Sequence, residues 1–305
     1  MRSSFRPWQL AAGLVAICLF IVGITFYLHW GTPVSPAQLI AYLPQKDAPV
    51  MYLDLKALRD SGVLDKLVGS AVNEEPEYKL FVQQTGFDYK TDLDTVVATS
   101  LKDTHYFILR GHFDWKNVIS YVTSQGGACL NGFCRITDPK GNRNVSLYAV
   151  NKQTMALSTG SNEWGASEIR IHNEGIPFEV PKQPVWLSLP AATLQTANKL
   201  PPGTRQFAKV VEGAERLLFT MGARENGFEI VADVTCKTAE QAAVLKTQLE
   251  DLTKVLQSLI AREKQTPNLN DLSGVLTSGN FQRVDRHVLG RWPVQRAFID
   301  SLGGG

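Results

Sequence analysis

Residues Val50–Leu55 read VMYLDL, and residues Trp186–Leu189 read WLSL in the second half of the chain. A short apolar run of this kind, bounded by turn residues, is typical of a β-strand that lies in a protein core. Each run is followed by a stretch in which apolar residues recur at helical spacing. The two runs therefore predict the same local structure, a strand that leads into a helix, at two places in one chain.

The similarity continues beyond these two strands. His105–Phe113 (HYFILRGHF) and Gly227–Thr235 (GFEIVADVT) both alternate in polarity, and each belongs to a predicted strand hairpin that leads into an amphipathic helix. We therefore expect an α+β fold with two diverged repeats, a first unit at 48–176 and a second at 177–305. One continuous domain is the alternative.

Two further elements are predicted near the ends of these units. The residues Ser161–His172 favour a helix that closes the first unit. The residues Phe281–Trp292 (FQRVDRHVLGRW) favour one strand, followed by a short helix at the end of the chain.

A long helix is predicted over residues 239–264, where leucines recur at alternating steps of three and four residues. Such spacing, kept over about three heptads, is typical of a dimerising coiled coil. A helix lying on a sheet is the other interpretation, because Val244, Val255 and Ile260 widen the apolar stripe beyond a coiled-coil seam. The residues that could contact a partner are Leu245, Leu249, Leu252 and Leu256.

The chain begins with a candidate membrane anchor. Residues 8–30 contain no Asp, Glu, Lys or Arg, and a helix of this length crosses the roughly 30 Å hydrocarbon core of a bilayer. Arg2 and Arg6 precede the run, and cations near a membrane span favour the cytoplasmic side. We therefore expect residues 1–7 to be a cytoplasmic tail.

The run at 8–30 is interpreted as an uncleaved signal anchor that contacts the lipid bilayer. A cleaved signal peptide has a shorter apolar core, of about 7–15 residues, and a lipoprotein signal would need a small residue where Ile17 stands. Residues 31–47 then form a short tether with one or two helical turns. Everything that follows lies outside the cytoplasm.

The stretch CLNGFC, Cys129–Cys134, predicts a tight hairpin. Asn131-Gly132 is a preferred pair for a two-residue type I′ turn. Such a turn places the two cysteines opposite each other with Cα atoms about 4.5 Å apart, within reach of a disulfide. A compartment outside the cytoplasm favours that bond. Cys236 has no evident partner, and we expect it to be buried and reduced.

The composition excludes several classes of function. The 305 residues carry a formal net charge of only +2, which provides no electrostatic basis for binding nucleic acid. Phosphate-cradling, dinucleotide-binding, zinc-protease and serine-hydrolase motifs do not occur, and the five histidines are scattered singly. We therefore predict no catalytic residue, no metal site and no cofactor.

A few local features could still carry chemistry. His112 could act as a base beside Asp114, but Asp114 is also well placed to cap the following helix. Asp92 and Asp94 offer two carboxylates, which is too few for calcium. Asn144 begins an N-glycosylation sequon on a predicted turn.

Basic residues near the C-terminus form the strongest local charge bias. They could meet an acidic partner or anionic lipid, whereas the alternative is a solvated edge strand whose charges discourage aggregation. The cluster comprises Arg283, Arg286, His287, Arg291 and Arg296.

Two stretches near the start of the outer region carry a resemblance. APVMYLDLKALRDSGVLDKL (48–67) and GFDYKTDLDTVV (86–97), behind a short tail and a single anchor, resemble uncharacterised bacterial membrane-anchored proteins. The resemblance implies a single-pass protein of the bacterial inner membrane whose outer part faces the periplasm. It implies no functional residues.

Together these features lead us to expect a membrane-anchored extracytoplasmic module that binds or assembles without catalytic turnover. A protein partner or a homodimer fits this expectation. A periplasmic enzyme with an unrecognised site, or a structural dimer organised by the helix at 239–264, are the alternatives.

Overall fold

The fold is described from a computed structural model of the full chain. The predicted anchor at 8–30 lies outside the residues that it describes, and within them no helix is long and apolar enough to cross a membrane. The described residues are 34–44, 47–68, 76–137, 143–172, 176–195, 209–224, 227–262, 268 and 272–302.

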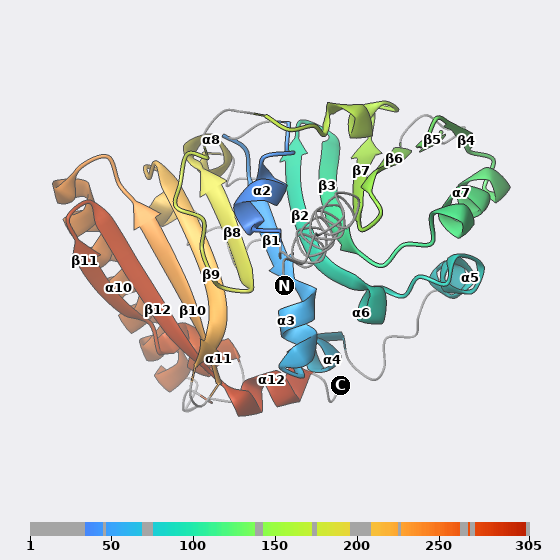
Figure 1. Cartoon of the computed structure of the whole chain (residues 1–305). Coiled ribbons are helices and arrows are strands. Elements are labelled where there is room, and N and C mark those ends of the chain that lie inside the picture. Colours follow the sequence, from blue (N-terminus) through green and yellow to red (C-terminus); the bar gives the residue numbers. More distant parts are fainter. Residues whose placement is uncertain are drawn as a thin grey trace, which may run out of the picture.

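One antiparallel sheet organises the described residues. Its twelve strands run in the order β11-β12-β10-β9-β8-β1-β2-β3-β7-β6-β5-β4 (Figure 1). The strands of the first half of the chain therefore occupy one half of the sheet, and those of the second half occupy the other. The prediction of a mixed α+β fold is confirmed.

The first half of the chain starts at the centre of the sheet and builds outward. Its elements are α2 (Pro36–Ile40), β1 (Val50–Asp54), α3 (Leu55–Asp60), α4 (Val63–Val68), α5 (Pro76–Thr85), α6 (Tyr89–Asp92), β2 (Leu93–Leu101), β3 (Thr104–Gly111), α7 (Trp115–Ser124), β4 (Ala128–Leu130), β5 (Phe133–Ile136), β6 (Asn144–Asn151), β7 (Thr154–Gly160) and the 3₁₀ turn η1 (Gly165–Glu168).

The second half also starts at the centre and builds in the other direction. Its elements are β8 (Val185–Pro190), α8 (Ala191–Leu194), β9 (Arg216–Arg224), β10 (Gly227–Thr235), α10 (Ala239–Arg262), α11 (Leu272–Thr277), β11 (Asn280–Val284), β12 (His287–Gln295) and α12 (Arg296–Leu302).

Strands β1 and β8 join the two halves at the middle of the sheet. Their antiparallel register places Tyr52 opposite Trp186. The two rings stack with centroids 5.3 Å apart and planes 10° apart, and both side chains are buried. The stretches VMYLDL and WLSL, far apart in the sequence, are therefore neighbours at the centre of the molecule.

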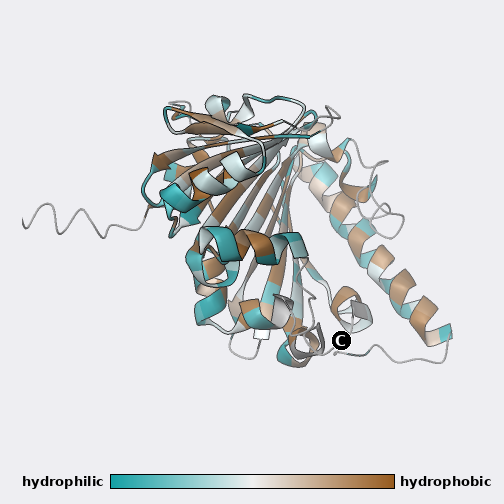
Figure 2. Ribbon diagram, turned by 90° about the vertical axis from the view of Figure 1, so that its right-hand side faces the viewer, coloured by the Kyte–Doolittle hydropathy of each residue, from teal (hydrophilic) through white to brown (hydrophobic). Residues whose placement is uncertain are grey.

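Helices cover one face of the sheet. By strand alternation, the apolar residues of this face pack against α3, α4, α5 and α7 in the first half and against α10, α11 and α12 in the second. The long helix in Figure 2 is α10, which runs beside the sheet and diverges from it toward its C-terminal end. The centre of the opposite face is covered by α2 and the segment 176–180.

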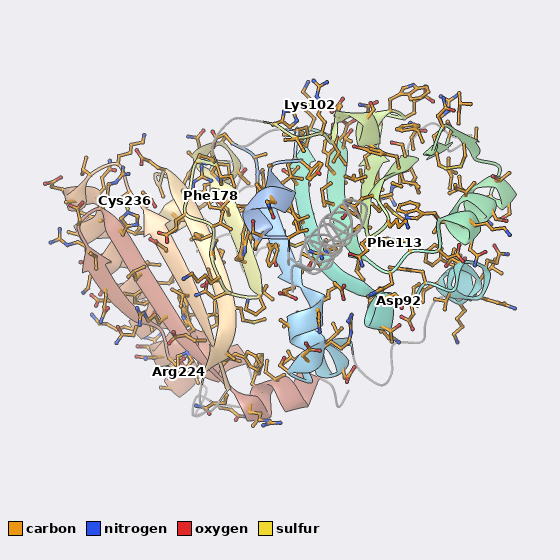
Figure 3. The ribbon with its side chains drawn as sticks, in the orientation of Figure 1. Asp92, Lys102, Phe113, Phe178, Arg224 and Cys236 are labelled. Carbon is orange, nitrogen blue, oxygen red and sulfur yellow. A yellow bond between two sulfur atoms is a disulfide. The ribbon has the colours of Figure 1, made fainter. Side chains whose placement is uncertain are left out.

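Outward from the centre, the two halves repeat one order of strands: β1-β2-β3-β7-β6 and β8-β9-β10-β12-β11. The hairpins β2–β3 and β9–β10 close on equivalent pairs, Leu101 with Thr104 and Arg224 with Gly227. Because β1 and β8 are antiparallel, these hairpins close at opposite ends of the strands, where Figure 3 labels Lys102 at the top and Arg224 at the bottom. Among the described residues, the β4–β5 hairpin has no counterpart in the second half.

Two predicted elements differ in the structure. The helix expected over Ser161–His172 is reduced to the short turn η1. This segment runs along the sheet, and the burial of Ala166 and Ile169 there replaces the helical packing. The single strand expected over Phe281–Trp292 is two strands, β11 and β12. Asp285 between them adopts a positive φ of 53°, which turns the chain back on itself.

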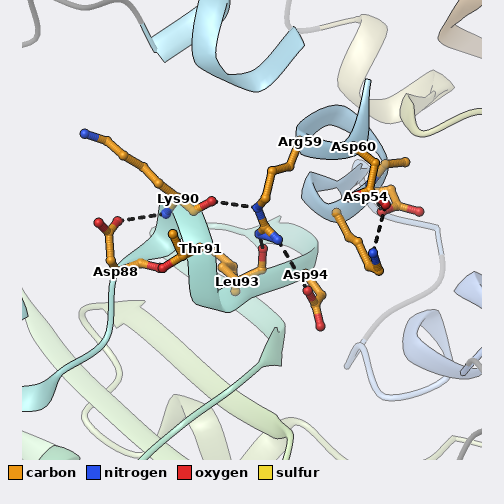
Figure 4. A network of polar contacts seen from close by, with 10 residues as sticks. Asp54, Arg59, Asp60, Asp88, Lys90, Thr91, Leu93 and Asp94 are labelled. Atoms are coloured by element: carbon orange, nitrogen blue, oxygen red, sulfur yellow. Dashed lines mark hydrogen bonds and ion pairs between the residues drawn. The ribbon is translucent and has the colours of Figure 1, made fainter. Parts of the chain in front are cut away.

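A polar network fixes α3 against the start of β2 (Figure 4). The Arg59 guanidinium donates to the carbonyl oxygens of Lys90 and Leu93, each at 2.7 Å, and lies 3.6 Å from a carboxylate oxygen of Asp94. The Arg59 side chain thus holds α3, which follows β1, against β2, which pairs with β1.

Helix α10 lies on the sheet through the first part of its length. Ala242, Leu245 and Leu249 belong to the core between this helix and the second half of the sheet. Thr253, one turn further along the helix, is also buried. Leu252 and Leu256 are half-buried. Leu245 and Leu249, which we considered as contacts to a second chain, are core residues of this chain and offer no free surface.

Two leucines of α10 should differ sharply in their contribution to stability. Leu249 is 6% exposed in the core, whereas Leu259 is 50% exposed near the end of the helix. We expect Leu249→Ala to lower the free energy of unfolding by about 2–5 kcal/mol, through lost contacts and the cavity left behind. Leu259→Ala should change it by less than about 0.5 kcal/mol.

Urea unfolding of both variants beside the wild type measures this difference. Equal losses for the two leucines would contradict the placement of α10 on the sheet.

Candidate functional site

Two hollows lie at corresponding places in the two halves. The first lies between the β3–α7 junction and the segment before β2, and the second between the start of α10 and the segment before β9. Phe113 and Cys236 stand at these junctions. Phe113 follows the first residue of β3, Thr104, by the same number of residues as Cys236 follows the first residue of β10, Gly227. In Figure 3, Cys236 lies on the left of the central strands and Phe113 on the right. Each half therefore has a hollow beside the helix that follows its second hairpin strand.

The first hollow is open, with walls of mixed polarity and a volume of about 580 Å³. It brings together the residues that the sequence offered for chemistry. Trp115 closes one side, because its indole N–H donates to the carbonyl oxygen of Lys152 at 3.0 Å. The side chains that line it include Asp92, His112, Phe113, Asp114, Trp115 and Lys152.

The carboxylates of this hollow already have structural roles. Asp114 Oδ1 accepts the backbone N–H groups of Lys116 and Asn117 at 3.0 and 3.1 Å, which makes Asp114 the N-cap of α7. Asp92 Oδ2 accepts the backbone N–H of Asp88 at 2.8 Å. The exposed His112 ring has no hydrogen bond to either described carboxylate. The arrangement therefore supports the capping interpretation of Asp114.

Two other predicted features have ordinary structural explanations. Asp94 faces Arg59, so it does not join Asp92 in a cation site, and the described residues contain no cluster of three metal-ligating side chains. Asn144 lies in β6 and not on a turn, and its buried amide donates to the carbonyl oxygen of Ser161 at 2.9 Å. An amide held in this way is not accessible to glycosylation.

The second hollow is smaller and mostly apolar, with a volume of about 350 Å³. Cys236 is a buried, free cysteine at its wall, as the sequence indicated. Burial raises the pKa of this thiol, and the carboxylates of Glu215 and Asp233 raise it further. The thiol therefore stays protonated and unreactive at neutral pH. Sequence reasoning did not find this hollow, because no local pattern marks it.

The CLNGFC stretch forms the predicted hairpin. Asn131 and Gly132 have φ of 51° and 80°, as a type I′ turn requires, and Cys129 pairs with Cys134. The two cysteines are joined by a disulfide, with Cα atoms 4.1 Å apart. Cys134 is buried against α7, so the disulfide fixes this hairpin to the core.

A cluster of exposed apolar and aromatic side chains lies on and beside this hairpin. Leu130, opposite Phe133 in register, is 76% exposed. The 48% exposed Trp164 stacks on Phe133 at 5.4 Å, and the Arg135 guanidinium lies 4.5 Å from the Trp164 ring. We call Leu130, Phe133, Arg135 and Trp164 the hairpin patch. Sequence reasoning missed it, because Trp164 reaches the hairpin only through the fold.

The basic cluster is largely engaged within the molecule. Arg286 pairs with Glu215 at 2.8 Å, and His287 Nδ1 lies 2.8 Å from Asp233. Arg283 donates to the carbonyl oxygen of Ala239. Arg291 is exposed on β12. Since Arg283, Arg286 and His287 have internal partners, the cluster is a weak candidate for an acidic partner.

No family model and no curated protein matches this chain. Among solved structures, crystal form I of the Treponema protein TP0453 aligns at 10% identity over 89% of this chain and 98% of that chain, with a TM-score of 0.47. Crystal form III aligns at 10% identity over 88% and 98%, with a TM-score of 0.45.

Substitutions in the first hollow should distinguish capping from chemistry. Asp114→Ala should lower the free energy of unfolding by about 1 kcal/mol, because two N–H groups of α7 lose their acceptor, and Asp114→Asn should retain most of it. His112→Ala at the exposed neighbour should change it by less than about 0.5 kcal/mol. Urea unfolding of the three variants measures these values. A loss with Asp114→Asn as large as that with Asp114→Ala would contradict the capping role.

The disulfide can be tested by counting thiols. The chain has four cysteines, so denaturation without reductant should expose the two free thiols of Cys18 and Cys236. The double variant Cys129→Ser/Cys134→Ser should lose about 2 kcal/mol of stability, the chain-entropy value for so short a loop. A count of four free thiols in the denatured, unreduced protein would rule out the disulfide. The control is the reduced protein, which should give four free thiols.

Proposed function

We propose that this protein is a binding or assembly module that acts outside the cytoplasm without catalytic turnover. Residues 8–30 anchor it as a single-pass protein in the bacterial inner membrane, with its N-terminus in the cytoplasm and the bulk of the chain in the periplasm. Its partner is a protein, which it contacts through the hairpin patch.

The observation that carries this proposal is the exposed, rigid hairpin patch. Leu130 and Trp164 are large side chains that the fold leaves in solvent, next to a disulfide that fixes the hairpin. The described residues of the second half build their part of the sheet without such a hairpin, so the shared strand order does not require its exposed tip. An addition to a shared architecture that displays apolar surface is best explained by a partner.

The chemistry of the hairpin patch suits a protein surface. Tryptophan and arginine are the residues most enriched among those that dominate protein–protein binding energies. Here Arg135 is held over Trp164 and is also paired with Glu163 at 3.1 Å. The stack is therefore ordered before a partner arrives, so binding costs little side-chain entropy.

Two features support a location outside the cytoplasm. The apolar run at 8–30 is long enough to span a bilayer, and Arg2 and Arg6 favour a cytoplasmic tail. The disulfide agrees with this location, since such bonds persist in oxidising compartments.

We further infer that the two halves arose by duplication. The repeated strand order, the equivalent hairpin closures and the corresponding hollows support this origin. After such a duplication, the hairpin patch would be a specialisation of the first copy.

The alternatives have weaker support. A catalytic site that pairs His112 with a carboxylate has little support, because both carboxylates of the first hollow accept backbone N–H groups. A dimer through the leucine seam of α10 would need Leu245 and Leu249, which are buried within the chain.

Site-specific photocrosslinking in the native membrane tests the proposed function. Leu130→p-benzoylphenylalanine in the full chain should give a discrete adduct with one protein, because the side chain points into the contact. Adding Trp164→Ala and Arg135→Ala should lower its yield by at least about tenfold, which corresponds to roughly 1.4 kcal/mol of binding energy.

The matched control is Val284→p-benzoylphenylalanine, at an exposed position on β11, the opposite edge of the sheet, where the native side chain is 58% exposed. It should not give this adduct. No adduct at Leu130, or the same adduct from both edges, would overturn the proposal.

A further inference from the structure

The sheet ends, on the side of the first half, at a strand whose outer edge is open. β4 is the last strand in the order of the sheet, so among the described residues β5 is the one strand that pairs with it (Figure 1). Ala128 and Leu130 are exposed, and Cys129 between them packs against the core beneath α7. One face of β4 is therefore covered by α7, and its outer edge is not covered by another strand.

The register of the hairpin decides which backbone groups of β4 point outward. In a hairpin with a two-residue turn, the closing pair exchanges both backbone hydrogen bonds and the next pair exchanges none. Here Leu130 and Phe133 are the closing pair, and Cys129 and Cys134 are the next. Their Cα–Cα distance of 4.1 Å agrees with a pair that is not hydrogen-bonded. The N–H and C=O groups of Cys129 therefore point away from β5, and they have no hydrogen bond to the described part of the chain.

The residues around this edge lack the features that usually prevent strand pairing. Exposed edge strands often carry charged residues or proline, which discourage pairing with another chain. The edge strand on the other side of the sheet, β11, carries the exposed Arg283. The stretch QGGACLNG at 125–132 contains no charged residue and no proline. The edge of β4 is therefore suited to pairing with a second strand.

An extended chain is the structure that fits such an edge. A helix uses its own backbone groups internally, whereas an extended chain can offer a donor and an acceptor to Cys129. Side chains alternate along a strand, so the residues on either side of the one that pairs with Cys129 lie on the face of Leu130. The Phe133 and Trp164 rings of the hairpin patch lie on this same face. Apolar residues at these two positions would cover Leu130, which is 76% exposed.

We propose that the protein partner adds an extended segment to the outer edge of β4. The segment forms hydrogen bonds with the N–H and C=O of Cys129 and packs apolar side chains, at alternate positions, against Leu130. The disulfide holds Cys129 in place, so the edge is ordered before the partner arrives. This inference rests on the proposed function, because it specifies how a partner binds at the hairpin patch.

A proline at position 129 tests the strand pairing. Cys129→Pro/Cys134→Ser is compared with the matched control Cys129→Ser/Cys134→Ser, each as the full chain in its native membrane and with Leu130→p-benzoylphenylalanine. Both lack the disulfide, and an edge strand tolerates proline where its N–H faces outward. The control should give the adduct. The proline variant should give at least about tenfold less, because the partner loses a donor and keeps an unpaired carbonyl group.

Hydrogen exchange keeps the test decisive if the proline variant does not fold. The chain with its native disulfide is crosslinked through Trp164→p-benzoylphenylalanine, which leaves β4 unmodified, and the adduct is purified. The amide hydrogen of Cys129 should exchange at least about tenfold more slowly in the adduct than in the chain alone, because it is hydrogen-bonded to the partner. Mass spectrometry of the peptide that contains residues 127–131 measures both rates.

The outcomes separate this inference from the proposed function. Equal adduct yields from the folded proline variant and its control would overturn the strand pairing and leave the proposed function standing, and so would equal exchange of the Cys129 amide in adduct and chain. No adduct from Leu130→p-benzoylphenylalanine with the native disulfide would overturn both. An adduct of twice the mass of the chain would identify a second copy and overturn pairing with a different protein.

Discussion

The pairing of β1 with β8 is the interaction on which the rest of the structure depends. It joins two half-sheets into one through main-chain hydrogen bonds, and the stacked rings of Tyr52 and Trp186 lie across it. Because the two strands are antiparallel, the hairpin β9–β10 closes at the opposite end of the strands from the hairpin β2–β3. The positions of the hairpins and of the hollows follow from this one contact.

The features with functional potential lie where the two halves differ. The hairpin β4–β5 is present in the first half alone among the described residues, and it carries Leu130 into solvent beside Trp164. At corresponding junctions, Phe113 stacks on Phe87 beside a hollow of mixed polarity, whereas Cys236 lies at the wall of a mostly apolar one. The strand order common to the two halves builds the sheet, and the features that distinguish the halves provide the candidate binding surfaces.

Much of the local structure could be predicted, because it depends on residues close together in the chain. The Asn131-Gly132 turn and the disulfide across it follow from turn chemistry, and the cap at Asp114 follows from its place before a helix. The same reasoning failed at Ser161–His172, where burial of Ala166 and Ile169 against the sheet overrides the helical pattern. It also missed the turn at Asp285, since no glycine or proline marks it.

The sequence by itself determined the local elements, the hairpin register, the apolar run at 8–30 and the similarity of VMYLDL to WLSL, because each depends on neighbouring residues or on composition. Only the tertiary structure decided that the two similar strands pair with each other, that Leu245 and Leu249 face the sheet, and that Trp164 completes the hairpin patch. These outcomes depend on contacts between residues far apart in the chain, whose pairing is fixed by the packing of the whole sheet and leaves no local pattern in the sequence.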